Sequence, residues 1–376
     1  MTAPDGAGAT VEARRLALPF SIAVEPMERL LLVNLERDPD SVYAGFEPQA
    51  FDDEVHGRGL IVLAWRRDGR VDLYHQGGLR LDPSGYDIAG GGLHAMHERA
   101  FDGAWFEVRD AGVDADVRFD DADGRRIEIT VRELGARPRP RIGLLAPMGS
   151  AASAPSALPL VLLRDFSFVR RARSEVRVAI DGREHAVDRL PIPIERQSVY
   201  FVRYARSPLI ARLNPAHDGP VATLDAGRSG TQVLPEAVGE TRVEVRHRGG
   251  AAAIARLERR SAGQSVRLDL DPPFPNLLDL ADGADLAGAF TITSDPSLGR
   301  VAGAYRASRS GDAVRIAMTP SGGWRPAERR WSIRLVYAVA PVFRRWPTTY
   351  AWSAELDLTA GVDAPTMRSR WERPAS

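Results

Sequence analysis

Cysteine is absent from this chain of 376 residues, and so is lysine. Without cysteine there is no disulfide, no thiolate nucleophile and no cysteine-ligated metal site. Without lysine there is no Schiff-base chemistry, no attachment of pyridoxal phosphate and no phosphate-binding loop of the Walker type. Arginine therefore supplies all 50 basic residues, and 50 acidic residues balance them. The formal net charge of zero provides no overall field to attract nucleic acid or an anionic membrane.

Long apolar runs are also missing. None approaches the roughly 20 residues of a membrane-spanning helix, and the N-terminus lacks the pattern of a signal peptide. We therefore expect a soluble cytoplasmic protein without a membrane span. Residues 1–16 and 363–376 are rich in Ala, Gly, Pro and Arg, and we expect them to be loose.

The main pattern in the sequence is a period-two alternation of apolar and polar residues, which is typical of half-buried strands. Odd positions are apolar from 113 to 119 and again from 127 to 131. Asp-Gly-Arg occurs at 68–70, 123–125 and 181–183 and predicts three hairpin turns. Further strands are predicted at RVEVRH, SVRLDLD, AYRASRSGDAVRIAM, WSIRLVYAV and YAWSAELDL. The best helix candidate is MERLLLVNLER, which is also compatible with a strand.

The predicted fold is mainly β, with two consecutive antiparallel β-barrels. Segment 217–240 is rich in Gly, Pro and small polar residues and predicts a boundary between a domain at 17–218 and a smaller one at 238–362. Barrel closure removes exposed sheet edges and encloses a cavity. The segment APMGSAASAPSALPL, from 146 to 160, predicts a long loop over a barrel mouth. A single β-supersandwich is the alternative architecture.

This layout resembles the two-domain lipocalin-like proteins that include carotenoid hydratase (hydroxyneurosporene synthase) and related cyclases. The shared features are a larger N-terminal barrel, a Pro-rich loop and a smaller C-terminal barrel that ends in an aromatic strand. The resemblance implies a lipophilic substrate in an apolar cavity and acid-catalysed addition or cyclisation without a cofactor. It rests on layout, so no catalytic residue of that family is transferred to this chain.

The densest group of potential metal ligands is GLHAMHERAF, which contains His94, His97 and Glu98. On a helix the two histidines would share a face with the carboxylate, an arrangement that suits zinc. The flanking glycines and the strand-like WFEVR instead favour a polar connection between strands. We therefore predict no metal, and keep His94 as a candidate for substrate binding.

Several polar residues on predicted strands are candidates for substrate binding or for catalysis. Alternation places His75 inward, either as a core histidine or as a catalytic group, and Tyr74 on the opposite face. Arg203 also points inward and needs a carboxylate partner or an anionic ligand group. Tyr204 is a further candidate for placing the substrate's polar end. Trp324 belongs to an aromatic group that either contacts ligand or forms the core, and whose other members are Trp331, Trp346, Tyr350 and Trp352.

Asp165 interrupts the most apolar run of the chain, LPLVLLRDFSFV. On a strand, alternation places Asp165 with Leu163, Ser167 and Val169. A carboxyl among apolar neighbours has a raised pKa and can act as a general acid near neutral pH. The alternative is an ionised Asp165 paired with an inward arginine such as Arg203.

Three functions are compatible with these observations. The first is a cofactor-independent hydratase, cyclase or isomerase, hence a lyase or isomerase, that acts on a lipophilic isoprenoid or polyketide-like substrate with Asp165 and His75 as catalytic residues. The second is a non-catalytic carrier of a lipid or metabolite in the same cavity. The third is a carbohydrate-active supersandwich protein, although the sequence shows no obvious pair of carboxylates. A lipophilic small molecule is the expected partner, and nucleic acid is not.

Overall fold

The computed structural model describes residues 14–133, 135, 138, 141–147, 155–194, 196–340, 342–359, 361 and 364–373. Strands make up 61% of the structure and helices 7%, so the predicted mainly β class is confirmed. The strands form three larger sheets and one two-stranded sheet. Much of the loop expected at 146–160 lies outside the described residues.

The first large sheet, sheet B, has the strand order β2-β16-β12-β15-β3-β4-β5-β6-β7, with β11 also paired to β12. Only the β6–β7 pair is parallel among its described pairings. The possible helix at 27–37 is the strand β3. The ten strands are β2 (Ile22–Pro26), β3 (Arg29–Asn34), β4 (Tyr43–Asp53), β5 (Gly57–Arg66), β6 (Val71–His75), β7 (Leu93–Glu98), β11 (Ile142–Ala146), β12 (Leu158–Arg170), β15 (Val199–Arg206) and β16 (Leu209–Leu213).

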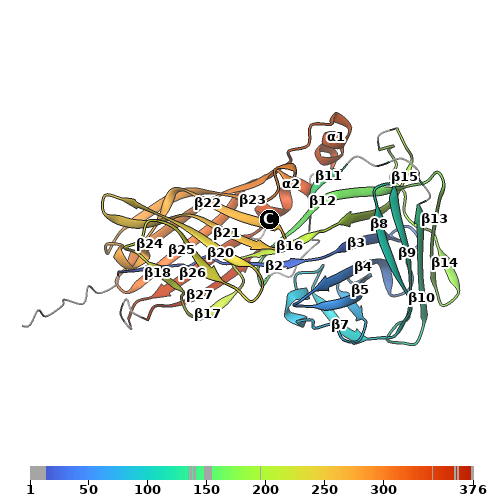
Figure 1. Cartoon of the computed structure of the whole chain (residues 1–376), viewed down its shortest axis with the longest axis horizontal. Helices are drawn as coiled ribbons and strands as arrows, with labels where there is room; N and C mark the ends of the chain where they lie inside the picture. Colours follow the sequence, from blue (N-terminus) through green and yellow to red (C-terminus); the bar gives the residue numbers. More distant parts are fainter. Residues whose placement is uncertain are drawn as a thin grey trace, which may run out of the picture.

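A five-stranded antiparallel sheet, sheet C, covers one face of sheet B (Figure 1). Its strands are β8 (Phe101–Arg109), β9 (Gly112–Asp120), β10 (Arg126–Glu133), β13 (Ser174–Ile180) and β14 (Arg183–His185). The apolar odd positions of 113–119 and 127–131 are fully buried against alternate residues of sheet B such as Leu31, Val62 and Val202. This contact occupies one face of sheet B and leaves its other face for the cavity described below.

The three Asp-Gly-Arg tripeptides are hairpin turns, as predicted. They join β5 to β6, β9 to β10 and β13 to β14. Gly69, Gly124 and Gly182 have φ values of 86°, 78° and 78°. Glycine populates this left-handed region without the steric penalty that a Cβ brings.

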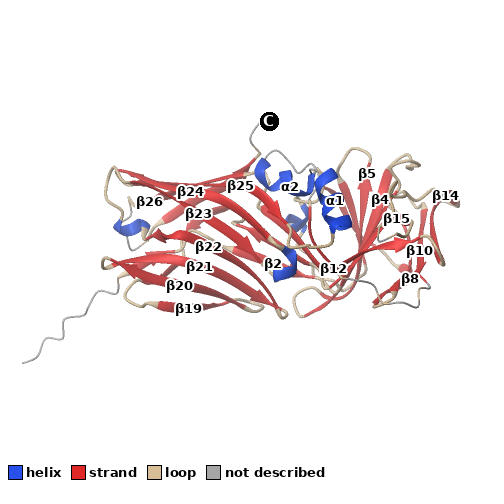
Figure 2. Ribbon diagram, turned by 90° about the horizontal axis from the view of Figure 1, so that it is seen from above, coloured by secondary structure: helices blue, strands red, loops and turns tan. Residues whose placement is uncertain are grey.

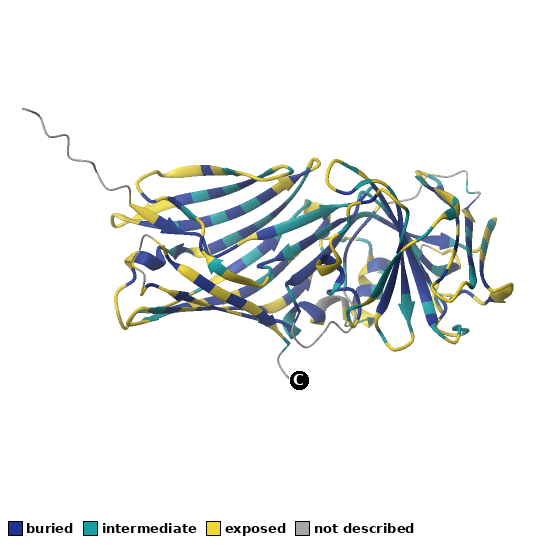
Figure 3. Ribbon diagram, turned by 90° about the horizontal axis from the view of Figure 1, so that it is seen from below, coloured by how far each residue is buried: buried dark blue, intermediate teal, exposed yellow. Residues whose placement is uncertain are grey.

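The C-terminal sheet, sheet F, is antiparallel, and it curls into a half-barrel (Figures 1 and 2). Its strand order is β17-β27-β26-β25-β24-β23-β22-β21-β20-β19. Buried and exposed residues alternate along these strands (Figure 3). The strands are β17 (His217–Pro220), β19 (Gly230–Pro235), β20 (Glu240–Arg248), β21 (Ala251–Ser261), β22 (Gln264–Pro275), β23 (Asp285–Thr293), β24 (Arg300–Ser310), β25 (Ala313–Arg325), β26 (Ala351–Asp357) and β27 (Thr366–Glu372).

Pairing between strands leaves both large sheets open within the described residues. Sheet B ends at β2 and β7, and sheet F ends at β17 and β19. Two consecutive closed barrels are therefore not confirmed. The two sheets also share a hydrophobic core, to which β12 and β16 of sheet B and most strands of sheet F contribute.

Segment 217–240, the predicted domain boundary, is largely made of strands. It contains β17, which pairs with β27, and β19, which pairs with β20. Between them lies β18 (Thr223–Asp225), which pairs with β1 (Arg15–Ala17). The expectation of loose ends is wrong for β1 and β27, because the apolar residues Leu16 and Trp371 of these strands are fully buried.

The segment WSIRLVYAV is a helix, α1 (Trp331–Val339), and the predicted strand is wrong. Its apolar residues satisfy both periods, so alternation alone could not distinguish the two structures. Packing distinguishes them, because Ile333 and Tyr337 are buried whereas Leu335 between them is 49% exposed, which fits a helix and not a strand. The remaining helical elements are α2 (Val342–Arg345), η1 (Pro83–Tyr86), η2 (Leu277–Asp279), η3 (Pro296–Leu298) and η4 (Trp346–Thr349).

Candidate functional site

The second face of sheet B lines an apolar cavity of about 590 Å³. Side chains reach it from β3, β4, β5, β11, β12, β15 and β16, and most of them are aliphatic or aromatic. Side chains alternate along these strands, so neighbouring residues face opposite sides of the sheet. Leu32, Leu63 and Phe201 face the cavity, whereas their neighbours Leu31, Val62 and Val202 are part of the core against sheet C.

Helix α1 contributes part of the cavity wall from the C-terminal half of the chain. Ile333, Val336 and Tyr337 line the cavity, and the Tyr337 hydroxyl donates a hydrogen bond of 2.9 Å to the carbonyl of Gly143 on β11. Seen from above, α1 and α2 lie between sheet F and the strands of sheet B (Figure 2). The cavity is thus built from both halves of the chain.

Arg203 is a cation inside this apolar space. It follows Phe201 by two residues on β15, and its guanidinium carbon lies 4.1 Å from the centre of that ring. One terminal nitrogen donates a hydrogen bond to Asn34, but the buried Nε has no hydrogen-bond partner among the described residues. Burial lowers the pKa of Arg203 to about 10, which leaves the side chain charged at neutral pH.

The charge of Arg203 is not balanced by a direct ion pair. No carboxylate of a described residue forms an ion pair with Arg203, and Glu47 is the acidic group that acts most strongly on it. Glu47 is itself buried, with 9% of its surface exposed, and burial raises the pKa of its carboxyl. Glu36 and Asp188 also act on Arg203, but neither forms an ion pair with it. A cation without an ion pair in an apolar cavity is costly unless an anion binds beside it.

Two donors hold the Glu47 carboxyl in place. The Gln49 side chain donates a hydrogen bond of 2.9 Å to Oε1, and the Trp65 indole donates one of 3.2 Å to Oε2. Glu47 and Gln49 lie two residues apart on β4, so both point to the cavity side of sheet B. Asn34, Glu47, Gln49, Trp65 and Arg203 thus form one polar cluster of the cavity, which is also lined by the charged residues Glu25, Glu36 and Arg66.

Of the residues chosen from the sequence, Arg203 is the one that lines this cavity. Asp165 does not, because β12 contains a β-bulge. Phe166 pairs with Ile142 and Leu163 pairs with Leu144, so β12 has one residue more than β11 in this interval. The extra residue moves the cavity side of β12 from the odd position Leu163 to the even position Phe166.

Asp165 instead faces a shallow surface pocket. Its carboxylate lies 3.5 Å from Arg141, and 26% of its side chain is exposed. The predicted partner Arg203 lies in the cavity and is not in contact with Asp165. The expected apolar enclosure of Asp165 is therefore wrong, while its catalytic role stays a prediction.

The other predicted residues of the N-terminal half lie outside the cavity lining. Tyr74 and Tyr204 belong to the core between sheets B and C. Tyr74 hydrogen-bonds to the Tyr43 hydroxyl at 2.7 Å, and Tyr204 donates to Glu133 at 3.3 Å. His75 is half-buried, and its Nδ1 lies 3.0 Å from the carbonyl of Gln76.

The segment that contains His94, His97 and Glu98 is the strand β7 and not a polar turn. His94 lies 2.6 Å from Asp72, and the His97 ring stacks on Tyr74 with 5.3 Å between centroids. Within the part of the chain that the structure describes, no three His, Asp or Glu side chains form a group that could hold a metal ion. Absence of a metal stays a prediction.

Most of the predicted aromatic group is core. Trp324, Trp346, Tyr350 and Trp352 are buried, whereas Trp331 is 78% exposed. The Trp324 indole donates a hydrogen bond of 2.6 Å to the carbonyl of Leu298, and its ring lies 5.0 Å from that of Tyr337. Trp324 thus supports a residue of the cavity wall from behind.

The sequence reasoning missed Glu47, Gln49 and Trp65. A usable signal is the stretch AGFEPQAF, in which Glu47 and Gln49 alternate with apolar residues inside a run that also has few charges. Polar residues on an otherwise apolar strand indicate a buried polar site when both faces of the sheet are covered. Cover on both faces of sheet B becomes visible only in the folded chain.

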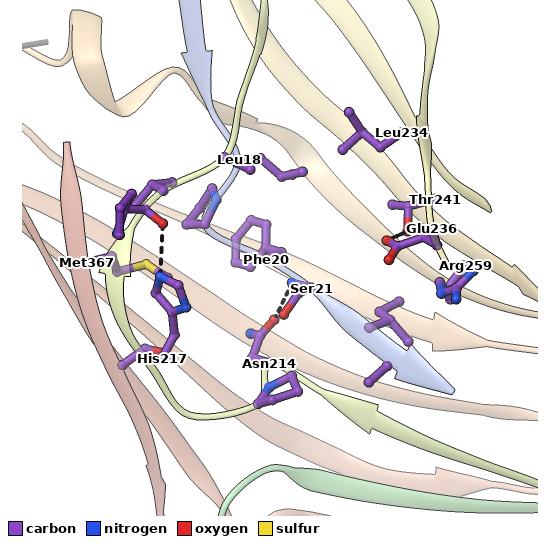
Figure 4. Close-up of a pocket in the computed structure, with 18 of the residues that line it drawn as sticks. Leu18, Phe20, Ser21, Asn214, His217, Leu234, Glu236, Thr241, Arg259 and Met367 are labelled. Carbon is purple, nitrogen blue, oxygen red and sulfur yellow. Dashed lines mark hydrogen bonds between the residues drawn. The ribbon is translucent and has the colours of Figure 1, made fainter. Parts of the chain in front are cut away.

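A second pocket lies on the open side of sheet F (Figure 4). Residues 18–24 pass between the two edges of the half-barrel, and Phe20 lies at the centre of the pocket with its ring 4.7 Å from that of Phe274. Two pairs of its polar groups bind each other: Asn214 accepts from the Ser21 amide at 3.1 Å, and Thr241 donates to Glu236 at 2.6 Å. The Ser369 hydroxyl also lines this pocket and has no hydrogen-bond partner among the described residues.

Comparison with known proteins adds no assignment. The chain matches no protein-family model, and neither a curated protein nor a solved structure is detectably similar to it. Among the described residues, no helix combines the length and apolarity that crossing a membrane requires.

Proposed function

We propose that the protein binds a lipophilic small molecule with an anionic end group in the cavity of sheet B. The volume of about 590 Å³ falls within the range of about 300–1,000 Å³ that is common for small-molecule sites. The aliphatic and aromatic lining suits the apolar body of such a ligand. The observation that carries the proposal is the half-buried Arg203, which has no ion pair and whose buried Nε has no hydrogen-bond partner among the described residues.

A carboxylate is the end group that fits best. It accepts two hydrogen bonds from a guanidinium side by side, and it satisfies the unpaired Nε of Arg203. Burial raises the pKa of Glu47, which favours the neutral carboxyl that donates a hydrogen bond to the ligand and does not repel it. Long-chain fatty acids and carboxylated isoprenoids have this combination of body and end group.

Titration with a matched pair of ligands tests the proposal. Hexadecanoate and hexadecanol have the same chain and differ in the charge of the end group. We expect hexadecanoate to raise the melting temperature of the protein and to bind at least about tenfold more tightly than the alcohol, which corresponds to one charge-assisted hydrogen bond. Equal binding of the two, or binding of neither, contradicts the proposal.

A matched variant separates the cavity from the rest of the surface. Arg306 is an exposed arginine of sheet F whose ion-pair partner is Asp285. Replacement of Arg306 by methionine leaves the preference for hexadecanoate unchanged, whereas Arg203→Met removes it.

Acid catalysis by Glu47 is a second candidate function, and the burial of this carboxyl in the cavity favours it. A protonated Glu47 donates its proton to an alkene carbon and becomes a carboxylate that the charge of Arg203 stabilises. Water or a substrate hydroxyl then adds to the carbocation and returns a proton to Glu47, which completes a hydration or a cyclisation. Glu47→Gln abolishes turnover of an alkene substrate and preserves its binding if this function holds; unchanged turnover contradicts it.

A lipocalin-like barrel character and a cytoplasmic location fit both candidate functions and stay predictions. The half-barrel of sheet F and the curled sheet B support the first. The carbohydrate-active alternative receives no support from the cavity, whose lining is mainly apolar.

A further inference from the structure

Helix α1 has a second apolar face that no described part of the chain covers. Trp331, Leu335 and Val339 follow one another at intervals of four residues, which places them on one side of the helix. Their exposed fractions are 78%, 49% and 68%, and Val342 at the start of α2 is 50% exposed. These four residues form what we call the outer face of α1.

This outer face is exceptional for the molecule. Four of the nine large apolar residues that are exposed in the described part of the chain lie within these twelve positions. The other five, which are Val55, Trp105, Ile192, Val233 and Leu286, are scattered over different elements. Single exposed apolar residues are normal, whereas a contiguous group marks an interaction site.

Positive charge is concentrated in the segment that contains the outer face. Residues 325–345 include six arginines and one acidic residue, Glu328, which is 2.6 Å from Arg330. Arg325, Arg329, Arg334 and Arg345 are exposed, and none of them forms an ion pair with a described residue. The zero net charge of the whole chain thus conceals a cationic segment.

We propose that the outer face of α1 docks on an anionic lipid bilayer. Apolar side chains enter the boundary between head groups and acyl chains, while arginines contact the anionic head groups. Each arginine at such a surface strengthens partitioning about fivefold. A protein partner would need a matching acidic surface, whereas an anionic bilayer satisfies the charge and the apolar residues together.

The position of α1 links this surface to the cavity. The inner side of the helix carries Ile333, Val336 and Tyr337 of the cavity wall, and Val342 of the outer face also lines the cavity. In Figure 1, α1 stands out beyond β11 and β12 at the top of the molecule. A docked α1 brings the cavity wall to the bilayer, which is where a lipophilic ligand would enter or leave. Docking itself does not depend on the identity of that ligand.

Flotation with vesicles tests the docking surface. One set of vesicles consists of phosphatidylcholine alone, and the other of seven parts phosphatidylcholine and three parts phosphatidylglycerol. We expect the full chain to float with the anionic vesicles at low salt, and to bind the neutral vesicles at least about tenfold more weakly. Raising the salt concentration weakens the binding because it screens the arginines.

Two double variants and one control make the test specific. Trp331→Ser with Val339→Ser, and Arg329→Gln with Arg334→Gln, each reduce binding to anionic vesicles about tenfold or more. Trp105→Ser is the matched control, since Trp105 is 55% exposed on β8 and far from α1 in sequence, and it leaves binding unchanged. All these side chains are exposed, so the melting temperatures stay close to that of the original protein.

Three results would overturn the proposal. The first is a full chain that floats with neither set of vesicles. The second is an equal loss of binding in Trp105→Ser. The third is a dimer in light scattering that Trp331→Ser with Val339→Ser dissociates while the protein binds no vesicle, because the outer face would then contact a second copy of the chain.

Discussion

Replacing Arg203 by methionine tests whether the protein keeps this arginine for a ligand. Burial lowers its pKa to about 10, and one unit of pKa equals about 1.4 kcal/mol, so the charge costs the folded state on the order of 3 kcal/mol. The methionine variant also loses the hydrogen bond to Asn34 and the contact with Phe201, which offsets about 1–2 kcal/mol of the stability gained by removing the charge. We expect the ligand-free variant to be more stable by about 1–2 kcal/mol.

The pH dependence of this gain follows from the direction of the pKa change. A cation whose pKa is lowered on folding is penalised at every pH below its folded pKa, and the penalty disappears as the pH rises above about 10. The gain in the methionine variant is therefore constant around neutral pH and shrinks in strong alkali. For a chain of this length, about 1–2 kcal/mol raises the melting temperature by roughly 1–3 °C.

Thermal melts with and without hexadecanoate measure both effects. A ligand at about one hundred times its dissociation constant stabilises the protein by roughly 2.7 kcal/mol, which is a shift of about 3–4 °C here. We expect this shift in the original protein and in Arg306→Met, and its loss in Arg203→Met. A ligand-free Arg203→Met that is less stable by more than about 2 kcal/mol would refute the reasoning, because Arg203 would then be a structural residue.

Three further substitutions probe separate parts of the account. The pKa of Glu47 is raised on folding, so its contribution to stability is complete below the ordinary value of 4.5 and is lost as the pH rises through the folded value. The melting temperature of Glu47→Gln therefore increases relative to that of the original protein as the pH rises. Parallel pH profiles of the two melting temperatures would show that Glu47 is not desolvated. Asp165→Asn changes stability by less than about 1 kcal/mol and leaves hexadecanoate binding intact, as expected for a carboxylate beside the exposed Arg141; abolished binding in a titration would place the site at Asp165. Phe20→Ala lowers the free energy of unfolding in urea by about 3–5 kcal/mol, because Phe20 is 2% exposed inside the half-barrel; a loss below about 1 kcal/mol would show that residues 18–24 do not fill it.

Strands were the predictable part of the fold. In β9, β10 and β26 the alternation of apolar residues matches the buried positions, and the Asp-Gly-Arg turns occur where they were predicted. Helix α1 could not be predicted in this way, because WSIRLVYAV fits both periods and only contacts such as Tyr337 to Gly143 select the helix. The openness of the sheets also depends on long-range pairing that no local pattern contains.

The candidate site was predictable only in part. Alternation placed Arg203 and Phe201 on the same side of β15, which the cavity lining agrees with. It failed for Asp165, since a single bulge in β12 reverses the faces beyond Leu163. It also missed Glu47, because a glutamate on a strand is ordinarily exposed and becomes a site residue only when both faces of its sheet are covered.

A crystal structure with a brominated long-chain carboxylic acid tests the central claim most directly, because the anomalous signal of bromine locates the end of the chain. The account predicts the carboxylate within hydrogen-bond distance of Nε of Arg203 and of the Glu47 carboxyl. It also predicts the bromine among the apolar side chains between β12 and α1. A carboxylate in solvent with the apolar chain against Arg203, or a ligand bound outside this cavity, would contradict the account.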